Sequence, residues 1–434
     1  MRPWLADSGW VLFGRVAALS GGLAAQVTLA RLLTPEDLGR FFVWSSVVGA
    51  VSALASFGIG PVAMRHIAMH QHSGEGSHAH GFARGTVRLG ALCGLGSSGL
   101  LFVAGAVFTP SLLLPALAAG WTALLAVKSV LADVLRGFRD IRAATIITDI
   151  LGGWLGLLGL LALAALLPPL TVANAVVGLS LGLMAAAAFG LSALRQHLAP
   201  LPTPAAAPPV QWWWRQSSSV WMNTGLWLAF GQMDLWILSL FRSPAEVAVY
   251  GLASRLSVVL NQPELVSRAV LMPRIAPIHA EGKRDSLQRM VRSAAAASGA
   301  VALLGTLALA LGGDRALSAI FGPTYRASLP LALILAGGQV AGSAAGLGAT
   351  TLLMTGHQSL VVRGSMAGFS CTLLLLLVLV PIHGATGAAT ATALGMVFQN
   401  LLMLGLAKRS LGIWTAASVR PAEWRTVWRL LRVT

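Results

Sequence analysis

Residues 172–194 read VANAVVGLSLGLMAAAAFGLSAL and contain no charged side chain. An α-helix needs about 20 apolar residues to cross the hydrocarbon core of a bilayer. Alanine, leucine and glycine dominate this run, and apolar and polar residues do not alternate as they would in a barrel strand. The run therefore predicts a transmembrane helix.

The rest of the chain has the same character. Of its 434 residues, 56% are apolar and only 10% are charged, and its mean hydropathy is +0.76. A soluble domain carries about 25% charged residues, so the composition excludes a cytoplasmic enzyme, a nucleic-acid-binding module and a disordered protein. We expect an all-α polytopic membrane protein with twelve transmembrane helices. Their expected limits are 10–33, 41–63, 87–109, 113–135, 143–167, 172–194, 217–240, 248–272, 293–312, 328–353, 364–381 and 387–407.

Basic residues in the loops set the expected orientation. With the N-terminus inside the cell, the inner loops hold 21 of the 30 lysine and arginine residues, and the outer loops hold four. Cytoplasmic loops of membrane proteins are enriched in lysine and arginine. We therefore expect both termini to be cytoplasmic.

A break rich in proline and alanine at 200–209 divides the chain. Six expected spans precede it and six follow it, which predicts a cytoplasmic linker between two lobes. We expect an N-terminal lobe at 1–199, a linker with a belt of tryptophans at 200–216, and a C-terminal lobe at 217–409. The segment 410–434 is expected to be a basic amphipathic tail on the inner membrane surface.

The two halves share a motif. TPED at 34–37 aligns with SPAE at 243–246, and the same offset of 209 residues takes Arg65 to Arg274. Because six helices separate equivalent positions, both halves keep one orientation. The expected symmetry is a pseudo-twofold axis along the membrane normal, with a cavity between the lobes.

Ionisable side chains inside a membrane span are costly and usually face a cavity, a partner or water. Arg15 is the first such residue, and at about 100° per residue Gly22 and Gln26 lie on the same helix face. A cation on a face of small and polar residues predicts a cavity-lining position. The alternative is that Arg15 extends to the inner membrane surface, which lies about two turns away.

The seventh expected helix, 217–240, carries a second polar face. Asn223 and Asp234 are eleven residues apart and therefore lie on the same side of the helix. The carboxyl group of Asp234 would pair with an arginine, bind a cation or carry a proton. The alternatives are a structural ion pair and an acid at the outer end that meets headgroups.

The eighth expected helix is the most polar span. It contains Arg255, Asn261, Gln262, Pro263, Glu264 and Arg268. Glu264 and Arg268 lie four residues apart, which favours a mutually neutralised pair, with a role in substrate binding as the alternative. Arg255 has no acid at this spacing, so we expect it to line the cavity together with Asn261 and Gln262. Pro263 frees backbone carbonyls and is expected to bend the helix.

The remaining polar groups indicate no further site. Lys128, Asp133 and Asp149 flank a positive inner loop and are expected to form ion pairs near the membrane surface. The histidines between His66 and His80 are separated by a flexible SGEGS stretch, which predicts a solvated loop rather than a zinc site. The sequence contains no catalytic set, phosphate-binding loop or paired-acid site, so we expect neither an enzyme nor a bound metal or cofactor.

Several motifs in order resemble one known family. They are LARLLTPEDLG at 29–39, FGIG at 57–60, MDL at 233–235, VAVYGLASRL at 247–256, IFGPTY at 320–325 and HGATGAA at 383–389. Together they are similar to the polysaccharide-transport (Wzx-type) flippases of the multidrug/oligosaccharidyl-lipid/polysaccharide (MOP) exporter superfamily. The resemblance covers nearly the whole chain.

The resemblance implies two six-helix lobes around a cationic cavity, in a multi-pass protein of the bacterial cytoplasmic (inner) membrane. It implies a flippase that moves a polyprenyl-diphosphate-linked oligosaccharide, an O-antigen or exopolysaccharide repeat unit, from the inner to the outer leaflet by alternating access. Its ligands would be an undecaprenyl-diphosphate-linked glycan and the bilayer. Its protein partners would be a polysaccharide polymerase or glycosyltransferases. The resemblance assigns cavity roles to Arg15, Asp234 and Arg255, and arginine suits a diphosphate because its fork of donors binds phosphate oxygens in pairs.

Three alternatives stay open. A multidrug or metabolite exporter of the same superfamily would show acids rather than arginines in the cavity, since its substrates are usually cations. An O-antigen polymerase or ligase would carry a large outer loop, whereas the longest expected outer loop here is 313–328. A peptidoglycan-precursor flippase usually has two more helices than the twelve expected here.

Overall fold

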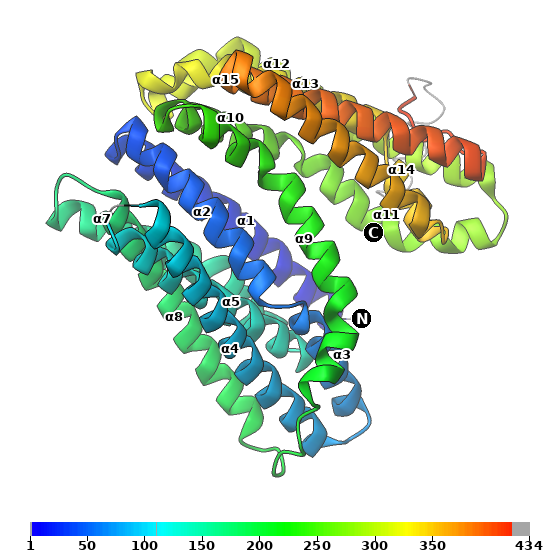
Figure 1. Ribbon diagram of the computed structural model, residues 1–434. Helices are drawn as coiled ribbons and strands as arrows, with labels where there is room; N and C mark the ends of the chain where they lie inside the picture. Colours follow the sequence, from blue (N-terminus) through cyan, green and yellow to red (C-terminus); the bar gives the residue numbers. More distant parts are fainter. Residues whose placement is uncertain (1, 110, 419–434) are drawn as a thin grey trace. The chain divides into compact units, whose positions relative to one another are not determined.

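The computed structural model describes residues 2–109 and 111–418, and every regular element in these ranges is a helix (Figure 1). Eight of the described helices are long and apolar enough to cross a membrane. The expected all-α membrane fold is therefore confirmed. The chain divides into two compact units, Met1–Gln232 and Met233–Thr434, and the division falls inside one long helix, α9.

The first unit is built around α5. Its elements are α1 (Arg2–Leu32), α2 (Pro35–Ala55), α3 (Ile59–His72), α4 (Gly76–Phe108), α5 (Leu113–Gly137), α6 (Ile141–Thr145), the π-helix η1 (Ile146–Leu151), α7 (Gly152–Leu166), α8 (Val172–Leu198) and the first part of α9 (Val210–Phe241). α5 contacts α2, α3, α4 and α8, and α7 lies along α8 (Figure 1). Leu131, Val134 and Leu135 of α5 are completely buried. Close van der Waals packing of this kind holds helices together in a membrane, where the hydrophobic effect does not drive their association.

The second unit is built around α13. Its elements are the end of α9, α10 (Pro244–Leu260), α11 (Gln262–Ala280), α12 (Arg284–Ile320), the 3₁₀ turn η2 (Pro323–Ala327), α13 (Ser328–Ala345), α14 (Gly348–Met354) and α15 (Gln358–Leu411). α13 contacts α10, α12 and α15. α15 contains both of the last two expected spans, joined through Gly384, whose φ of 58° and ψ of −133° are not helical.

The motif repeated at an offset of 209 residues forms the same local structure twice. Thr34 has φ −64° and ψ 155°, and Ser243 has φ −63° and ψ 153°. The Thr34 hydroxyl accepts the backbone N–H of Asp37 at 3.2 Å, and the Ser243 hydroxyl accepts that of Glu246 at 3.4 Å. Each hydroxyl caps a helix whose first turn contains proline, as the sequence motif predicts.

The second expected span of each half is broken into two helices. In the first half the break falls at Phe57 and Gly58, whose φ values are 45° and 67°. Trp221 of α9 fits into this break: its ring stacks on Phe57 with centroids 5.5 Å apart, and its Nε1 donates to the Leu54 carbonyl at 3.0 Å. The unbroken helix expected at 41–63 is therefore wrong, because a tryptophan distant in sequence supports a left-handed turn there.

In the second half the break falls at Asn261, just before Pro263. Pro263 lies in the first turn of α11, where its missing N–H removes no helical hydrogen bond. The expected bend at this proline is confirmed. Each half thus starts with one long helix followed by a pair of shorter ones.

The linker is packed against α4. The Ala205 N–H donates to the Ser77 carbonyl at 2.9 Å, and His80 Nδ1 lies 2.9 Å from the Pro202 carbonyl. The Ala205 carbonyl also lies directly over Gly81, where a β-carbon would collide with it. The linker therefore packs closely against α4 at Gly81, which has no side chain to block it.

The tryptophans after the linker are not an interfacial belt as a group. α9 begins at Val210, earlier than the expected 217, and carries Trp213 into the core of the first unit, where it is 3% exposed and 5.6 Å from Phe82 between ring centroids. Trp212 packs on Phe82 as well, and only Trp214 is exposed. The belt prediction is wrong for Trp213, because the linker brings the start of α9 against α3 and α4.

The histidine-rich segment is an ordered hairpin of α3 and α4. His66 stacks on Phe82 at 5.1 Å, and His70 stacks on His78 at 5.3 Å. His70 Nδ1 lies 2.6 Å from a carboxyl oxygen of Glu75. The expected flexible loop is reduced to a turn, since aromatic contacts fix the rings on either side of it.

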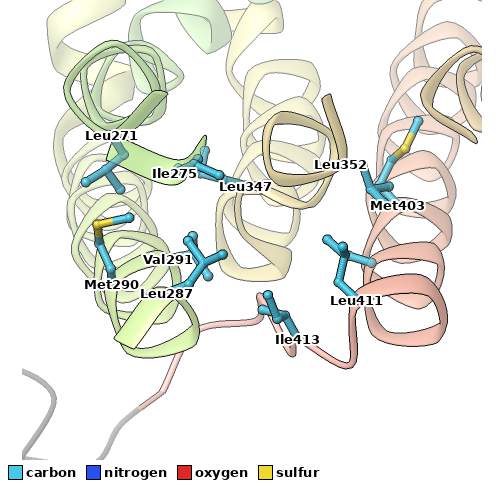
Figure 2. Packing of buried hydrophobic residues seen from close by; sticks show 11 residues of the cluster. Leu271, Ile275, Leu287, Met290, Val291, Leu347, Leu352, Met403, Leu411 and Ile413 are labelled. Carbon is cyan, nitrogen blue, oxygen red and sulfur yellow. The ribbon is translucent and has the colours of Figure 1, made fainter. Parts of the chain in front are cut away.

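The end of α15 is followed by a non-helical segment, residues 412–418, in which Ile413, Thr415 and Ser418 are buried. Ile413 joins an apolar cluster formed by α11, α12, α14 and α15 (Figure 2). The Ala417 N–H donates to the Ala344 carbonyl at 2.7 Å, and the Thr415 hydroxyl donates to the Ala345 carbonyl at 3.0 Å. The segment thus covers the break between α13 and α14. The part of the expected amphipathic tail with Trp424 and Trp428 lies outside the described residues.

A β-carbon at Gly81 is expected to displace the linker. We expect Gly81→Ala to lower the free energy of unfolding by about 1–3 kcal/mol, since overpacked contacts lose stability on this scale. Gly99→Ala on the same helix is the matched control, because a β-carbon there meets open space. Chemical unfolding in detergent compares the two variants, and equal stabilities would contradict the packed linker.

Acid is expected to weaken the α3–α4 hairpin. Burial lowers the pKa of His66 below its ordinary value of 6.5, and the nearby Arg65 and His70 lower this pKa further. The unfolded chain then takes up this proton at a higher pH than the folded chain, so the free energy of unfolding falls as the pH drops below about 6.5. His66→Phe keeps an aromatic ring on Phe82 and removes the imidazole that takes up this proton.

The measurement is the melting temperature in detergent at pH 7.5 and pH 5.5. We expect the wild-type protein to lose more stability between these two conditions than the His66→Phe variant loses. An equal loss in both proteins would contradict the assignment.

Candidate functional site

Arg15 lies on α1, which has one tightly packed face and, next to it, one open face. Gly14 packs closely against α6 and η1, and Gly21, two turns away, packs against α7. Arg15 is exposed, and a β-carbon at Gly22, two turns from Arg15, would meet open space. α1 therefore packs through its Gly14 face, and the neighbouring face that carries Arg15 stays open.

Arg15 opens onto a pocket inside the first unit. The pocket has a volume of about 460 Å³. Its lining residues are Arg15, Met64, Arg136, Ile141, Thr145 and Asp149. Two guanidinium groups and one carboxylate thus face a space bounded by α1, α3, α5, α6 and η1. We call it the Arg15 pocket.

The wall that carries Asp149 is the π-helical turn η1 (Ile146–Leu151). A π-turn is rare, and such turns often mark functional sites because they widen the helix and shift its side chains. Lys128 Nζ of α5 reaches the Thr148 carbonyl at 3.5 Å and interacts electrostatically with Asp149. Arg136 pairs with Asp133 at 2.8 Å, so one of the expected inner ion pairs is present.

Gln26 lies three turns beyond Arg15 on α1 and is half-buried. It is not among the residues that line the Arg15 pocket. The proposed common role of Arg15 and Gln26 therefore stays a prediction from their shared helix face.

In the second unit Asp234 sits in a cluster of three hydroxyl and carboxyl groups. Tyr250 Oη of α10 donates to Asp234 Oδ2 at 2.5 Å, and Thr392 Oγ1 of α15 lies 3.4 Å from Tyr250 Oη. Tyr250 is completely buried. The sequence suggested an arginine as one possible partner of Asp234. In the described structure Asp234 is hydrogen-bonded to a tyrosine instead. The cluster joins the consecutive helices α9 and α10 to the distant helix α15.

Arg255 is half-buried on α10, one turn beyond Gly251. Its Nη1 donates to the Gly251 carbonyl at 3.3 Å, within its own helix. Arg255 thus lies on the same helix as Tyr250.

Glu264 and Arg268 form the expected pair at 2.8 Å, and the Ser343 hydroxyl lies 3.4 Å from the second Glu264 oxygen. Asn261 and Gln262 flank the break between α10 and α11 and are half-buried. The Gln262 amide donates to the Val258 carbonyl at 3.3 Å, close to the break. These contacts favour a structural role for Glu264 and Arg268, and a cavity role for Asn261 and Gln262 stays a prediction.

The structure places the predicted residues in two groups. Arg15 and Gln26 belong to the first unit, and Asp234, Arg255, Asn261, Gln262, Glu264 and Arg268 belong to the second. The Asn223 side chain lies outside the described part of the chain. Within the described residues, no set of three histidine, cysteine or acidic side chains comes together in a way that could hold a metal ion.

Sequence reasoning missed two residues that structure brings to these sites. Arg136 was placed in a positive inner loop, but it lies in the last turn of α5 and lines the Arg15 pocket. Tyr250 was noted only as part of a repeated motif. A signal was available for it, since only two tyrosines occur in the chain and this one follows an aspartate in the preceding span.

Solved structures with the same fold are transporters. An inward-facing multidrug resistance MATE family transporter of the MOP superfamily has a TM-score of 0.74 and 14% identity, over 91% of this chain and 94% of that one. The lipid II flippase MurJ in an inward closed conformation has a TM-score of 0.72 and 10% identity, over 99% and 92%. A MOP superfamily transporter from Pyrococcus furiosus, described as having a binding pocket of reverse polarity, has a TM-score of 0.61 and 12% identity, over 93% and 94%.

The fold and its apolar helices thus define a multi-pass membrane protein with the architecture of MOP-superfamily transporters. Residues 9–279 match the family described as "Polysaccharide biosynthesis protein". This match covers more than half of the sequence, and the chain belongs to that family. A search of curated proteins finds no match.

Removing the Tyr250 hydroxyl is expected to destabilise the second unit. Tyr250→Phe removes the hydroxyl that donates to Asp234, and a hydrogen bond to a charged group contributes about 1.5–3 kcal/mol. We expect a loss of that size in the free energy of unfolding, measured by chemical unfolding in detergent. In an Asp234→Asn background the same substitution is expected to have a smaller effect. Equal losses in both backgrounds would show that the two groups are not coupled.

Proposed function

We propose that this protein is a flippase that moves a polyprenyl-diphosphate-linked oligosaccharide across the bacterial cytoplasmic membrane. The substrate is a repeat unit of an O-antigen or exopolysaccharide, and it passes from the inner to the outer leaflet by alternating access. The protein transports its substrate without changing it chemically. The observation that carries this proposal is an exposed arginine, Arg15, beside a pocket with more guanidinium than carboxylate groups, on a helix expected to cross the membrane.

The charge of the candidate groups supports an anionic substrate. A guanidinium inside a membrane protein is stabilised by water, by carboxylates or by an anionic ligand. In each unit a carboxylate is already engaged by neighbours, Asp133 by Arg136 and Glu264 by Arg268. The diphosphate supplies the negative charge that Arg15 and Arg255 would bind, and arginine binds phosphate oxygens in pairs.

Family membership supports a substrate that carries a glycan. The chain belongs to a family described by polysaccharide biosynthesis, and one structural relative is a flippase of lipid II. The natural partners on this proposal are the undecaprenyl-diphosphate-linked glycan, the surrounding lipids, and a polysaccharide polymerase or glycosyltransferases. The excess of basic residues in alternate loops supports cytoplasmic termini.

A multidrug or metabolite exporter is the second candidate, and the similarity to a MATE family transporter favours it. An exporter of cations needs a carboxylate that is accessible to the substrate. Asp234 is the strongest candidate for that role, but Tyr250 and Thr392 surround it inside the second unit. The contacts of Asp234 therefore favour the flippase.

Loss of either arginine is expected to stop polysaccharide export. In the native host, we expect Arg15→Gln and Arg255→Gln each to lower surface polysaccharide at least tenfold, because a neutral side chain does not bind the diphosphate. Lipid-linked repeat units should accumulate inside the cell. Immunoblotting of surface polysaccharide and extraction of lipid-linked glycans measure the two effects.

Arg40→Gln is the matched control. Arg40 is an exposed arginine that pairs with Asp37 at 3.4 Å near the start of α2, and surface pairs of this kind contribute little. Its variant should export normally. Normal polysaccharide in both the Arg15 and the Arg255 variants, with the proteins inserted in the membrane, would exclude the proposed site.

A further inference from the structure

We propose that the Arg15 pocket is a self-contained anion subsite of the first unit. Arg15 and Arg136 bind one phosphate-type group, and the Asp149 carboxylate weakens that binding by opposing its negative charge. A phosphodiester and one phosphate of a diphosphate both have this chemistry. The biological meaning of the subsite rests on the flippase function proposed above, but the binding itself does not.

The first step is the charge of the pocket. Arg15 and Arg136 face Asp149 across a space of about 460 Å³. Asp133 engages Arg136 at 2.8 Å through one N–H, and a guanidinium has five such donors. Lys128, which interacts with Asp149, brings the local balance to three cations and two carboxylates. Among the described residues these groups leave a net positive charge, which suits an anion and disfavours a cation.

The second step is the rigidity of the wall opposite Arg15. Gly14 brings the α1 backbone directly against Thr145 and the Asp149 side chain. The π-turn behind Asp149 is fixed by Lys128, which donates to the Thr148 carbonyl. Arg15 follows Gly14 immediately, so its position relative to Asp149 is set by backbone packing. A preorganised arginine loses less entropy when it binds an anion than a mobile one.

The third step is the relation of Arg136 to its neighbours. Arg136 lies in the last turn of α5, where a cation interacts favourably with the C-terminal end of the helix. Its side chain is 40% exposed although it pairs with Asp133, so free donors remain accessible. Arg142, in the next helix, instead lies over the Trp10 ring at 5.8 Å and does not line the pocket. The two arginines therefore differ in role although both belong to the positive inner loop.

The test measures binding of inorganic pyrophosphate to the purified full-length protein in detergent. We expect Arg15→Gln and Arg136→Gln each to weaken binding at least tenfold, since each removes charge-assisted hydrogen bonds. Arg142→Gln is the matched control and should leave binding unchanged. Asp149→Asn should tighten binding several-fold by removing a negative charge from the pocket.

Several results would overturn the subsite. They are pyrophosphate binding that survives Arg136→Gln, binding that falls equally in Arg142→Gln, and binding that does not tighten in Asp149→Asn. Circular dichroism and size-exclusion elution of each variant verify that it is folded. Gly14→Ala gives an independent test, since a β-carbon there pushes α1 from the wall and should weaken binding without changing any charge.

The source of the anion is distinguished by competition. If the natural occupant is a lipid-linked diphosphate, farnesyl diphosphate should compete better than pyrophosphate. If it is a lipid headgroup, nanodiscs of phosphatidylglycerol should block pyrophosphate binding, and nanodiscs of phosphatidylcholine should not. If neither competes, the occupant is a free phosphate compound in the cytoplasm.

The same experiment separates this inference from the proposed function. Arg40→Gln, the control used for export, should leave pyrophosphate binding to the Arg15 pocket intact. A protein that binds pyrophosphate through Arg15 and Arg136 but exports polysaccharide normally in the Arg15→Gln variant would keep the subsite and exclude the flippase role. If the protein binds no pyrophosphate but its Arg15→Gln variant loses polysaccharide export, the subsite is excluded and the flippase role is kept.

Discussion

A charge inside a bilayer must have a partner or reach water, and this constraint organises the polar side chains of the whole molecule. The carboxylates discussed above each have a neighbour inside their own unit. Asp133 has Arg136, Asp234 has Tyr250, and Glu264 has Arg268. Lys128 interacts with Asp149. The acids are thus engaged locally, whereas Arg15 stays exposed beside a pocket of positive balance.

The breaks in the helices follow from the same requirement applied to the backbone. A carbonyl at a helix end needs a donor where no water is present. Trp221 supplies one at the break after α2, and the Glu246 carboxylate accepts the Ala385 N–H at 2.6 Å where α15 restarts after Gly384. Arg242 donates to the Pro381 carbonyl on the other side of that kink. Side chains from distant parts of the chain therefore satisfy backbone groups at these two breaks.

Much of the architecture could be predicted from the sequence. Uncharged runs predicted the helical spans, and the repeat at an offset of 209 residues predicted equivalent halves. Thr34 and Ser243 of this repeat cap their helices with nearly identical backbone angles. Pro263 predicted its bend correctly. These features depend on residues within one or two turns of each other, so a local pattern is enough to find them.

The rest depends on contacts between distant segments. The stack of Trp221 on Phe57, the linker over Gly81 and the burial of Trp213 each join residues more than one hundred positions apart. Hydropathy treats such residues as apolar or small and does not say what they touch. The Arg15 pocket has the same origin, because Arg15 and Arg136 come from α1 and α5. The sequence identified Arg15 because an ionisable side chain within a membrane span is costly. A local pattern could not show that Arg15 shares a pocket with an arginine at the end of another helix.

The most direct test of the account is transport by the purified protein in liposomes. One preparation contains a short-chain polyprenyl-diphosphate-linked oligosaccharide, and a second contains the cationic dye ethidium. If the arginines serve an anionic substrate, the protein will carry the glycolipid across the bilayer and will not move ethidium. Movement of ethidium without movement of the glycolipid would contradict the account and identify a cation exporter.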